Sequence, residues 1–172
     1  KCRAYQASEQ DIFVVTQMKC GTTWMQQIVF ELLHHGKGDL SDQGYRTMYA
    51  LSPWIETDPV ASVSMADAPL VSSYQKRIIK THMPANLTPY SHTAKYISVM
   101  RHPAGCYAST ADFTTFLLGP LAPARKYLLD WFCSDDMIWS SWPDHVKGWW
   151  QLHQKHSNIL FISYEEMKSD LS

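Results

Sequence analysis

A lysine, a glycine and two threonines stand close together in the segment 16–24, TQMKCGTTW. The apolar run 12–15 before it is short and rich in β-branched and aromatic residues, as buried strands are. After it, apolar residues recur at the spacing of one helical face, at positions 25, 28, 29, 32 and 33. At a strand-to-helix turn, free backbone N–H groups and the helix dipole favour an anion. The segment therefore predicts a phosphate site.

The order of residues in this turn differs from a Walker A motif. A nucleotide kinase-like phosphotransferase would carry GxxxxGK[ST], with the lysine after the glycines. Here Lys19 precedes Gly21, and the hydroxyls follow. An ordinary turn with a solvated lysine is the other alternative, so the rest of the chain must distinguish them.

The elements that would position this turn alternate between strands and helices. We predict strands at 77–81, 95–100 and 158–164, and helices over 104–116, from 142 to 152 and from 165 onwards. Residues 40–75 are expected to be mostly irregular with short helical turns, and 117–142 gives no clear pattern. This alternation predicts one α/β domain with a parallel sheet flanked by helices.

Polar side chains follow three of the predicted strands. Lys19 follows the first, Thr81 and His82 end the second, and Arg101 follows the third. Ligands of open parallel sheets bind beyond the carboxyl ends of the strands. We therefore expect these residues to converge on one site, although they are far apart in sequence.

The composition limits the range of functions. A net charge of −1 over 172 residues gives no overall basic footprint for nucleic acid. No apolar run is long enough to cross a bilayer, and the eight histidines show no metal-ligand spacing. The four cysteines form no CxxC pair, which favours reduced thiols and a cytoplasmic protein. Nucleic-acid, membrane and metal binding are therefore not expected.

Five segments in order resemble the soluble, cytosolic-type sulfotransferases that use 3′-phosphoadenosine 5′-phosphosulfate (PAPS). They are Lys-x-Gly-Thr-Thr-Trp at 19–24, KTHMP at 80–84, RHPAGCYAS at 101–109, VKGWW at 146–150 and ISYEEMK at 162–168. The resemblance covers about residues 11–170. It implies a P-loop-like nucleotide-binding architecture and a sulfuryl transfer to a small-molecule acceptor, through a hydroxyl or an amine.

The resemblance also assigns catalytic roles. His82 would be the general base on the acceptor, because imidazole titrates near working pH. Lys19 would neutralise charge on the departing 5′-phosphate, and Lys80 would help to stabilise the same transition state. Sulfuryl transfer is an in-line displacement, so positioning and charge supply most of the catalysis.

The remaining roles concern the nucleotide. The 5′-phosphate would be held by the loop of Lys19, Cys20, Gly21, Thr22, Thr23 and Trp24, in which Trp24 stacks on adenine. The 3′-phosphate would be held by Arg101 and Ser109, and Tyr164 would make a further contact. Met18 stands where the family usually has proline, and Cys20 where serine is common; neither change removes a charge.

One part of the family pattern is missing. Family members continue beyond Tyr164 to a glycine-rich Arg-Lys-Gly segment that completes the 3′-phosphate site, and this chain ends at Ser172. The resemblance therefore implies a single domain, 1–172, that lacks the N- and C-terminal segments of a full protein, and that full protein could form a homodimer. The alternative is a shortened relative with a weakened cofactor site. A non-catalytic nucleotide-binding domain is the remaining alternative.

Overall fold

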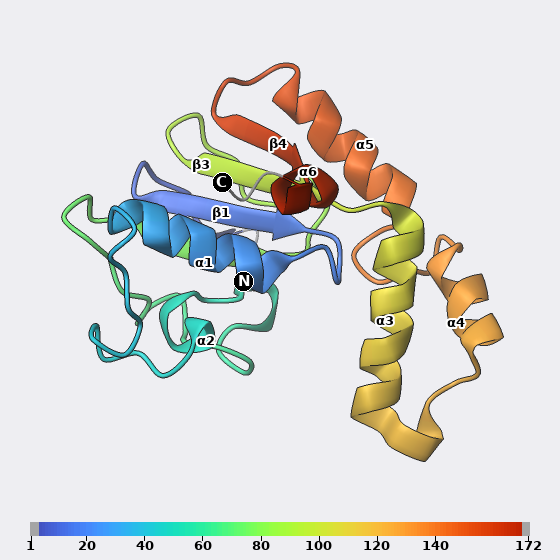
Figure 1. The fold of residues 1–172 in the computed structure, drawn as a ribbon. Coiled ribbons are helices and arrows are strands. Elements are labelled where there is room, and N and C mark those ends of the chain that lie inside the picture. Colours follow the sequence, from blue (N-terminus) through green and yellow to red (C-terminus); the bar gives the residue numbers. More distant parts are fainter. Residues whose placement is uncertain (1–3, 170–172) are drawn as a thin grey trace.

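The computed structural model describes residues 4–169. Four parallel strands form one sheet in the order β2-β1-β3-β4. Their bounds are β1 (Asp11–Thr16), β2 (Arg77–Thr81), β3 (Lys95–Met100) and β4 (Ile159–Ser163). Figure 1 shows the strands side by side, with the chain leaving β1 directly into a loop and helix. The predicted strands and the parallel sheet are confirmed.

Helices connect β1 to β2 and β3 to β4, and they cover the sheet (Figure 1). They are α1 (Thr22–Leu33), α2 (Met48–Leu51), α3 (Pro103–Leu118), α4 (Arg125–Phe132), α5 (Trp142–His153) and α6 (Tyr164–Ser169). Two 3₁₀ turns, η2 (Ile55–Thr57) and η3 (Gly119–Leu121), complete the elements. The short turns expected within 40–75 are thus α2 and η2.

The core has two layers because side chains alternate across the sheet. Val14 of β1 packs on one side with Val29 and Phe30 of α1. Phe13 lies on the other side with Trp149 of α5. Each of these side chains is at most 3% exposed, so both faces of β1 are buried. This burial explains why β1 is an uninterrupted apolar run.

The helices α3 and α4 extend beyond the carboxyl ends of the strands, side by side (Figure 1). They are joined by a hydrogen bond from the Tyr107 hydroxyl to the Arg125 carbonyl and by an Arg125–Asp112 ion pair. The helix α4 lies in the stretch 117–142 that gave no clear pattern. The helix α4 is only eight residues long and buries only Leu128 and Phe132, so its apolar spacing is too short to stand out in a stretch that also contains Gly119, Pro120 and Pro123.

No helix within residues 4–169 is long and apolar enough to span a membrane.

Candidate active site

The loop between β1 and α1 has the backbone of an anion site. Lys19 and Gly21 have positive φ values of 61° and 91°, and α1 begins at Thr22. The first turn of α1 contains no acidic residue. Its N–H groups therefore face the loop without a competing carboxylate, as the sequence predicted for a phosphate site.

Gly21 is required by its surroundings as well as by its φ value. A Cβ at this position would lie 2.8 Å from Cδ2 of Tyr164. We expect Gly21→Ala to cost about 1–3 kcal/mol of the free energy of unfolding, because the residue must strain or displace the ring. The measurement is urea unfolding of both proteins.

Gly44→Ala is the matched control for this prediction. Gly44 has a φ of 80° and no atom within 4 Å of the added Cβ, so it carries the backbone strain without the clash. Equal losses of stability in the two variants would contradict a specific role for the Gly21–Tyr164 contact.

Cys20 points away from this loop. Its side chain is fully buried, and its Sγ lies 3.7 Å from Sγ of Cys106 in α3. Both thiols are free, and Cys106 also donates to the Met18 carbonyl at 2.9 Å. The Cys20 side chain lies outside the cavity described below, so only its backbone is placed to contribute to the predicted cofactor site.

His82 has a defined tautomer. Its Nδ1 lies 2.8 Å from the Thr16 carbonyl oxygen, which can only accept, so Nδ1 carries the hydrogen. Nε2 then keeps its lone pair, and the ring lines the cavity. Burial, with the charge of Lys80, lowers the pKa of His82 to about 3. The sequence reasoning expected this ring to titrate near working pH, and burial overturns that expectation. The imidazole is neutral at pH 7, the state in which it can accept a proton.

The backbone of His82 is also fixed. Its N–H donates to the carboxylate of Glu56 in η2. Its carbonyl accepts from Nε2 of His145, 3.1 Å away in α5. His145 has only 2% of its surface exposed. This contact gives His145 a structural role, because it holds the backbone that carries His82.

Lys80 reaches the same cavity from β2. Its Nζ lies 3.7 Å from the centroid of the Trp54 ring, a cation–π contact. Burial lowers the pKa of Lys80 to about 8; the charge of Glu56 opposes this shift and that of Lys19 adds to it. Lys80 therefore titrates close to neutral pH, which an exposed lysine would not do.

Arg101 and Tyr164 form the other side of the site. The Arg101 guanidinium donates to the Lys19 carbonyl at 2.9 Å and lies 4.5 Å above the Tyr164 ring. The Trp24 ring meets Tyr164 edge to face at 5.5 Å. Arg101 thereby ties the end of β3 to the phosphate loop.

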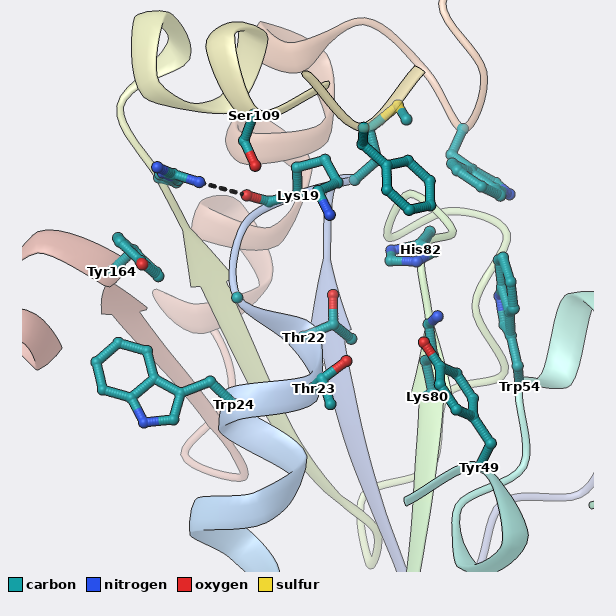
Figure 2. A pocket seen from close by; sticks show the side chains of 15 residues that line it. Lys19, Thr22, Thr23, Trp24, Tyr49, Trp54, Lys80, His82, Ser109 and Tyr164 are labelled. Carbon is teal, nitrogen blue, oxygen red and sulfur yellow. Dashed lines mark hydrogen bonds between the residues drawn. The ribbon is translucent and has the colours of Figure 1, made fainter. Parts of the chain in front are cut away.

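The side chains of the phosphate loop, of Lys80 and His82, and of Arg101 and Tyr164 line one cavity of about 400 Å³ at the carboxyl ends of the strands. In Figure 2, Trp24 and Tyr164 lie on one side, His82, Lys80 and Trp54 on the other, and Lys19 between them. Every predicted site residue except Cys20 is in the lining: Lys19, Gly21, Thr22, Thr23, Trp24, Lys80, His82, Arg101, Ser109 and Tyr164.

The sequence interpretation missed an aromatic wall and one carboxylate. The additional lining residues are Met18, Tyr49, Trp54, Phe113 and Trp139. Trp139 lies 4.7 Å from His82 and 5.8 Å from Trp54, between ring centroids. Tyr49, Trp54 and Trp139 belong to the two stretches without clear periodicity, and their only sequence signal was the abundance of aromatic residues. Met18 and Phe113 lie in segments that were predicted, but the sequence analysis gave their side chains no role. No sequence pattern pointed to Glu56, because its contact with the His82 N–H depends on the fold.

No cluster of three or more histidine, cysteine or acidic residues suited to a metal ion occurs within 4–169.

Comparison with known proteins identifies the family. Residues 9–172 match the model of the sulfotransferase domain, so the chain belongs to the sulfotransferase domain family. Human Sulfotransferase 2A1 is 30% identical over 169 residues, and mouse Sulfotransferase 2B1 is 34% identical. The alignments cover 94% and 95% of this chain but 55% and 47% of those proteins. The chain thus spans about half the length of the curated relatives it matches.

Solved structures agree with this assignment. Mouse sulfotransferase SULT7A1 complexed with PAP is 25% identical, with a TM-score of 0.67, over 98% of this chain and 56% of its own. A putative steroid sulphotransferase from Arabidopsis thaliana is 26% identical, with a TM-score of 0.72, over 98% and 60%. The fold is therefore the P-loop-like sulfotransferase fold, and the kinase-like alternative is ruled out by family membership.

Proposed function

We propose that this chain carries the transfer centre of a sulfotransferase that uses PAPS. The observation that carries the proposal is the junction at β1, where Thr16 holds His82 in the proton-accepting tautomer and Lys19 follows three residues later. A base for the acceptor and a cation for the leaving group thus face one cavity. Family membership supports the same reaction.

The side chains have complementary roles in this proposal. His82 accepts the acceptor's proton at Nε2, with Nδ1–H held by Thr16. Lys19 stabilises charge on the departing 5′-phosphate oxygen, and Lys80 stabilises the transferring group from the neighbouring strand β2. No side chain forms a covalent bond to the sulfuryl group, so positioning, charge and the proton transfer to His82 provide the catalysis. When the anionic donor is bound, its charge raises the proton affinity of His82 and favours proton transfer.

The residues present fit the donor PAPS. The cradle at Gly21, the α1 N-terminus and Lys19 suit its 5′-phosphosulfate, which PAPS supplies for transfer. Arg101 and Ser109 also line the cavity, and we propose that they bind the 3′-phosphate, the role that the resemblance gives them. Trp24 and Tyr164 present aromatic surface for the adenine. Because the matched relatives are longer, we propose that further segments complete this site.

The acceptor is proposed to be a small, flat molecule with a hydroxyl group. The wall of Trp54, Phe113 and Trp139 next to His82 gives it apolar contacts. One solved structure of the same fold, retinol dehydratase, at 21% identity, contains androsterone with PAP. A cytoplasmic location is proposed from relatives such as Cytosolic sulfotransferase 1 of Danio rerio.

Calorimetry and turnover of the full-length protein test this function. We expect PAP to bind, and radiolabelled sulfate to pass from PAPS to 2-naphthol or androsterone. Absence of PAP binding would contradict the proposed donor. Binding of PAP with no transfer to any of a panel of phenols, alcohols and amines would instead leave a non-catalytic nucleotide-binding domain.

The pH dependence of kcat/KM should show the titration of Lys80. Because the pKa of Lys80 is lowered to about 8, its charge is lost as pH rises through that value. We expect kcat/KM to fall above pH 8 in the wild type, and Lys80→Arg to remove this alkaline limb, since arginine stays charged.

Glu56→Gln provides the complementary test. The Glu56 carboxylate raises the pKa of Lys80, so its removal should move the alkaline limb to lower pH. A limb that stays in place in both variants would exclude Lys80 as its origin.

A further inference from the structure

Gln17 is a buried amide immediately after the strand that carries the site. It has 1% of its surface exposed and does not line the cavity. Its Oε1 accepts from the Met18 N–H at 2.7 Å. Its Nε2 donates to the carbonyls of Ser140 at 2.7 Å and Ile138 at 3.4 Å. These partners fix the orientation of the amide, since a flipped group would place Oε1 against two carbonyl oxygens.

The segment that Gln17 holds is the 138–140 loop, which carries Trp139. Trp139 and Ser140 have φ values of 63° and 83°, in the left-handed region that is unfavourable for both residue types. On either side the chain is anchored, by the buried Met137 and by Ser141, whose hydroxyl bonds Asp144 in α5. Between these two anchored residues, the hydrogen bonds from Gln17 keep the loop in its strained conformation.

The strained loop matters because of its central side chain. The Trp139 ring lies 4.7 Å from His82 and 5.8 Å from Trp54 and lines the cavity. The two carbonyls that Gln17 holds belong to the residues before and after Trp139. Releasing them would free the ring beside the general base, while the phosphate loop would keep its own contacts.

Neighbouring residues in this segment hold other parts of the site. The Thr16 carbonyl holds His82, and the Lys19 carbonyl accepts from Arg101. Gln17 holds the 138–140 loop, which carries Trp139 on the proposed acceptor side of the cavity. One short segment therefore connects the base, the acceptor wall and the nucleotide side of the cavity.

We propose that Gln17 is a positioning residue that fixes Trp139 as a wall of the acceptor site, so that acceptor affinity depends on Gln17 through Trp139. The inference rests on the proposed sulfotransferase function for its acceptor. It assigns Gln17 no contact with substrate and no part in the chemistry.

Gln17→Met tests the proposal in the full-length protein, because methionine keeps the length of the side chain and removes both N–H donors to the 138–140 loop, together with the acceptor for the Met18 N–H. We expect the KM for 2-naphthol to rise about 5- to 30-fold, the loss typical of a buried hydrogen-bonded group. The affinity for PAP by calorimetry and kcat should stay close to wild type. A rise in PAP dissociation constant equal to that of the acceptor KM would overturn the proposal.

Gln26→Met is the matched control. Gln26 is fully buried in α1 and donates from Nε2 to the Ser52 hydroxyl at 2.7 Å, away from the 138–140 loop. It should lower stability without changing the acceptor KM. A second test is a double-mutant cycle: in a Trp139→Ala background, Gln17→Met should have no further effect on the acceptor KM. A full additive effect there would contradict action through Trp139.

A readout without turnover separates this inference from the proposed function. In protein labelled with 5-fluorotryptophan, the ¹⁹F signal of Trp139, assigned by its loss in Trp139→Phe, should shift or broaden in Gln17→Met and stay unchanged in Gln26→Met. An unchanged Trp139 signal in Gln17→Met would overturn the inference, whether or not the wild type transfers sulfate. A wild type with no transfer would contradict only the proposed function.

Discussion

Replacing His82 by glutamine is expected to lower kcat for sulfuryl transfer by about 10²- to 10⁴-fold, the usual contribution of a general base. The glutamine amide can still donate to the Thr16 carbonyl, so the buried contact survives. It offers no basic nitrogen to the acceptor. PAP affinity should change little, because His82 lies across the cavity from Trp24 and Tyr164, the residues proposed to contact the adenine (Figure 2). Steady-state kinetics with PAPS and 2-naphthol, with calorimetry for PAP, give both quantities.

His153→Gln is the control for this variant. His153 also places Nδ1 2.8 Å from a backbone carbonyl, that of Ile159, but it lies outside the cavity. Its replacement should leave kcat close to that of the wild type. If His82→Gln retained wild-type turnover while binding PAP normally, the general base would have to be another group.

Replacing Lys19 by methionine should have the second large effect. We expect kcat to fall by about 10²- to 10³-fold, as when one donor to a developing charge is removed from a preorganised site. Lys19 already makes a cation–π contact with Phe113, its Nζ 4.1 Å from the ring centroid. Methionine keeps the apolar part of that contact and loses the charge. The backbone N–H groups of the loop remain, so the affinity for PAP should fall less than kcat does.

Lys126→Met provides the comparison, since Lys126 is an exposed residue of α4 and its loss removes one charge without touching the site. Its kinetics should match the wild type. A Lys19→Met enzyme that loses PAP binding and kcat in equal measure would show that Lys19 only binds the donor. Such a result would remove the role of Lys19 in charge stabilisation.

Much of the fold could be read from the sequence because local patterns agreed with it. The apolar run of β1 predicted a strand buried on both faces, and both faces are covered by the two halves of the core. The helix α1 followed from its apolar spacing, and the parallel sheet from the alternation of elements. The helix α4 was missed because it is only eight residues long and buries only two side chains, Leu128 and Phe132, so its apolar spacing was too short to stand out in the sequence.

The residues of the candidate site likewise fall into those that the sequence predicts and those that only the fold reveals. Lys19, His82 and Arg101 could be placed at one edge because parallel strands bring their carboxyl ends together. Glu56 and Gln17 could not be found, since each acts through a backbone group of a segment distant in sequence. The Cys20 side chain was expected near the cofactor; the structure turns it towards Cys106 instead.

The sequence by itself determined the succession of strands and helices along the chain, the family, and the residues that supply the charges and the base. Spacing and side-chain chemistry are local properties, and so the one-dimensional pattern contains them. Only the tertiary structure decided the tautomer of His82, the lowered pKa of Lys80 and the strained wall at Trp139. Each of these depends on which groups remote in sequence become buried together, because burial and hydrogen-bond partners set protonation and hold strained backbone in place.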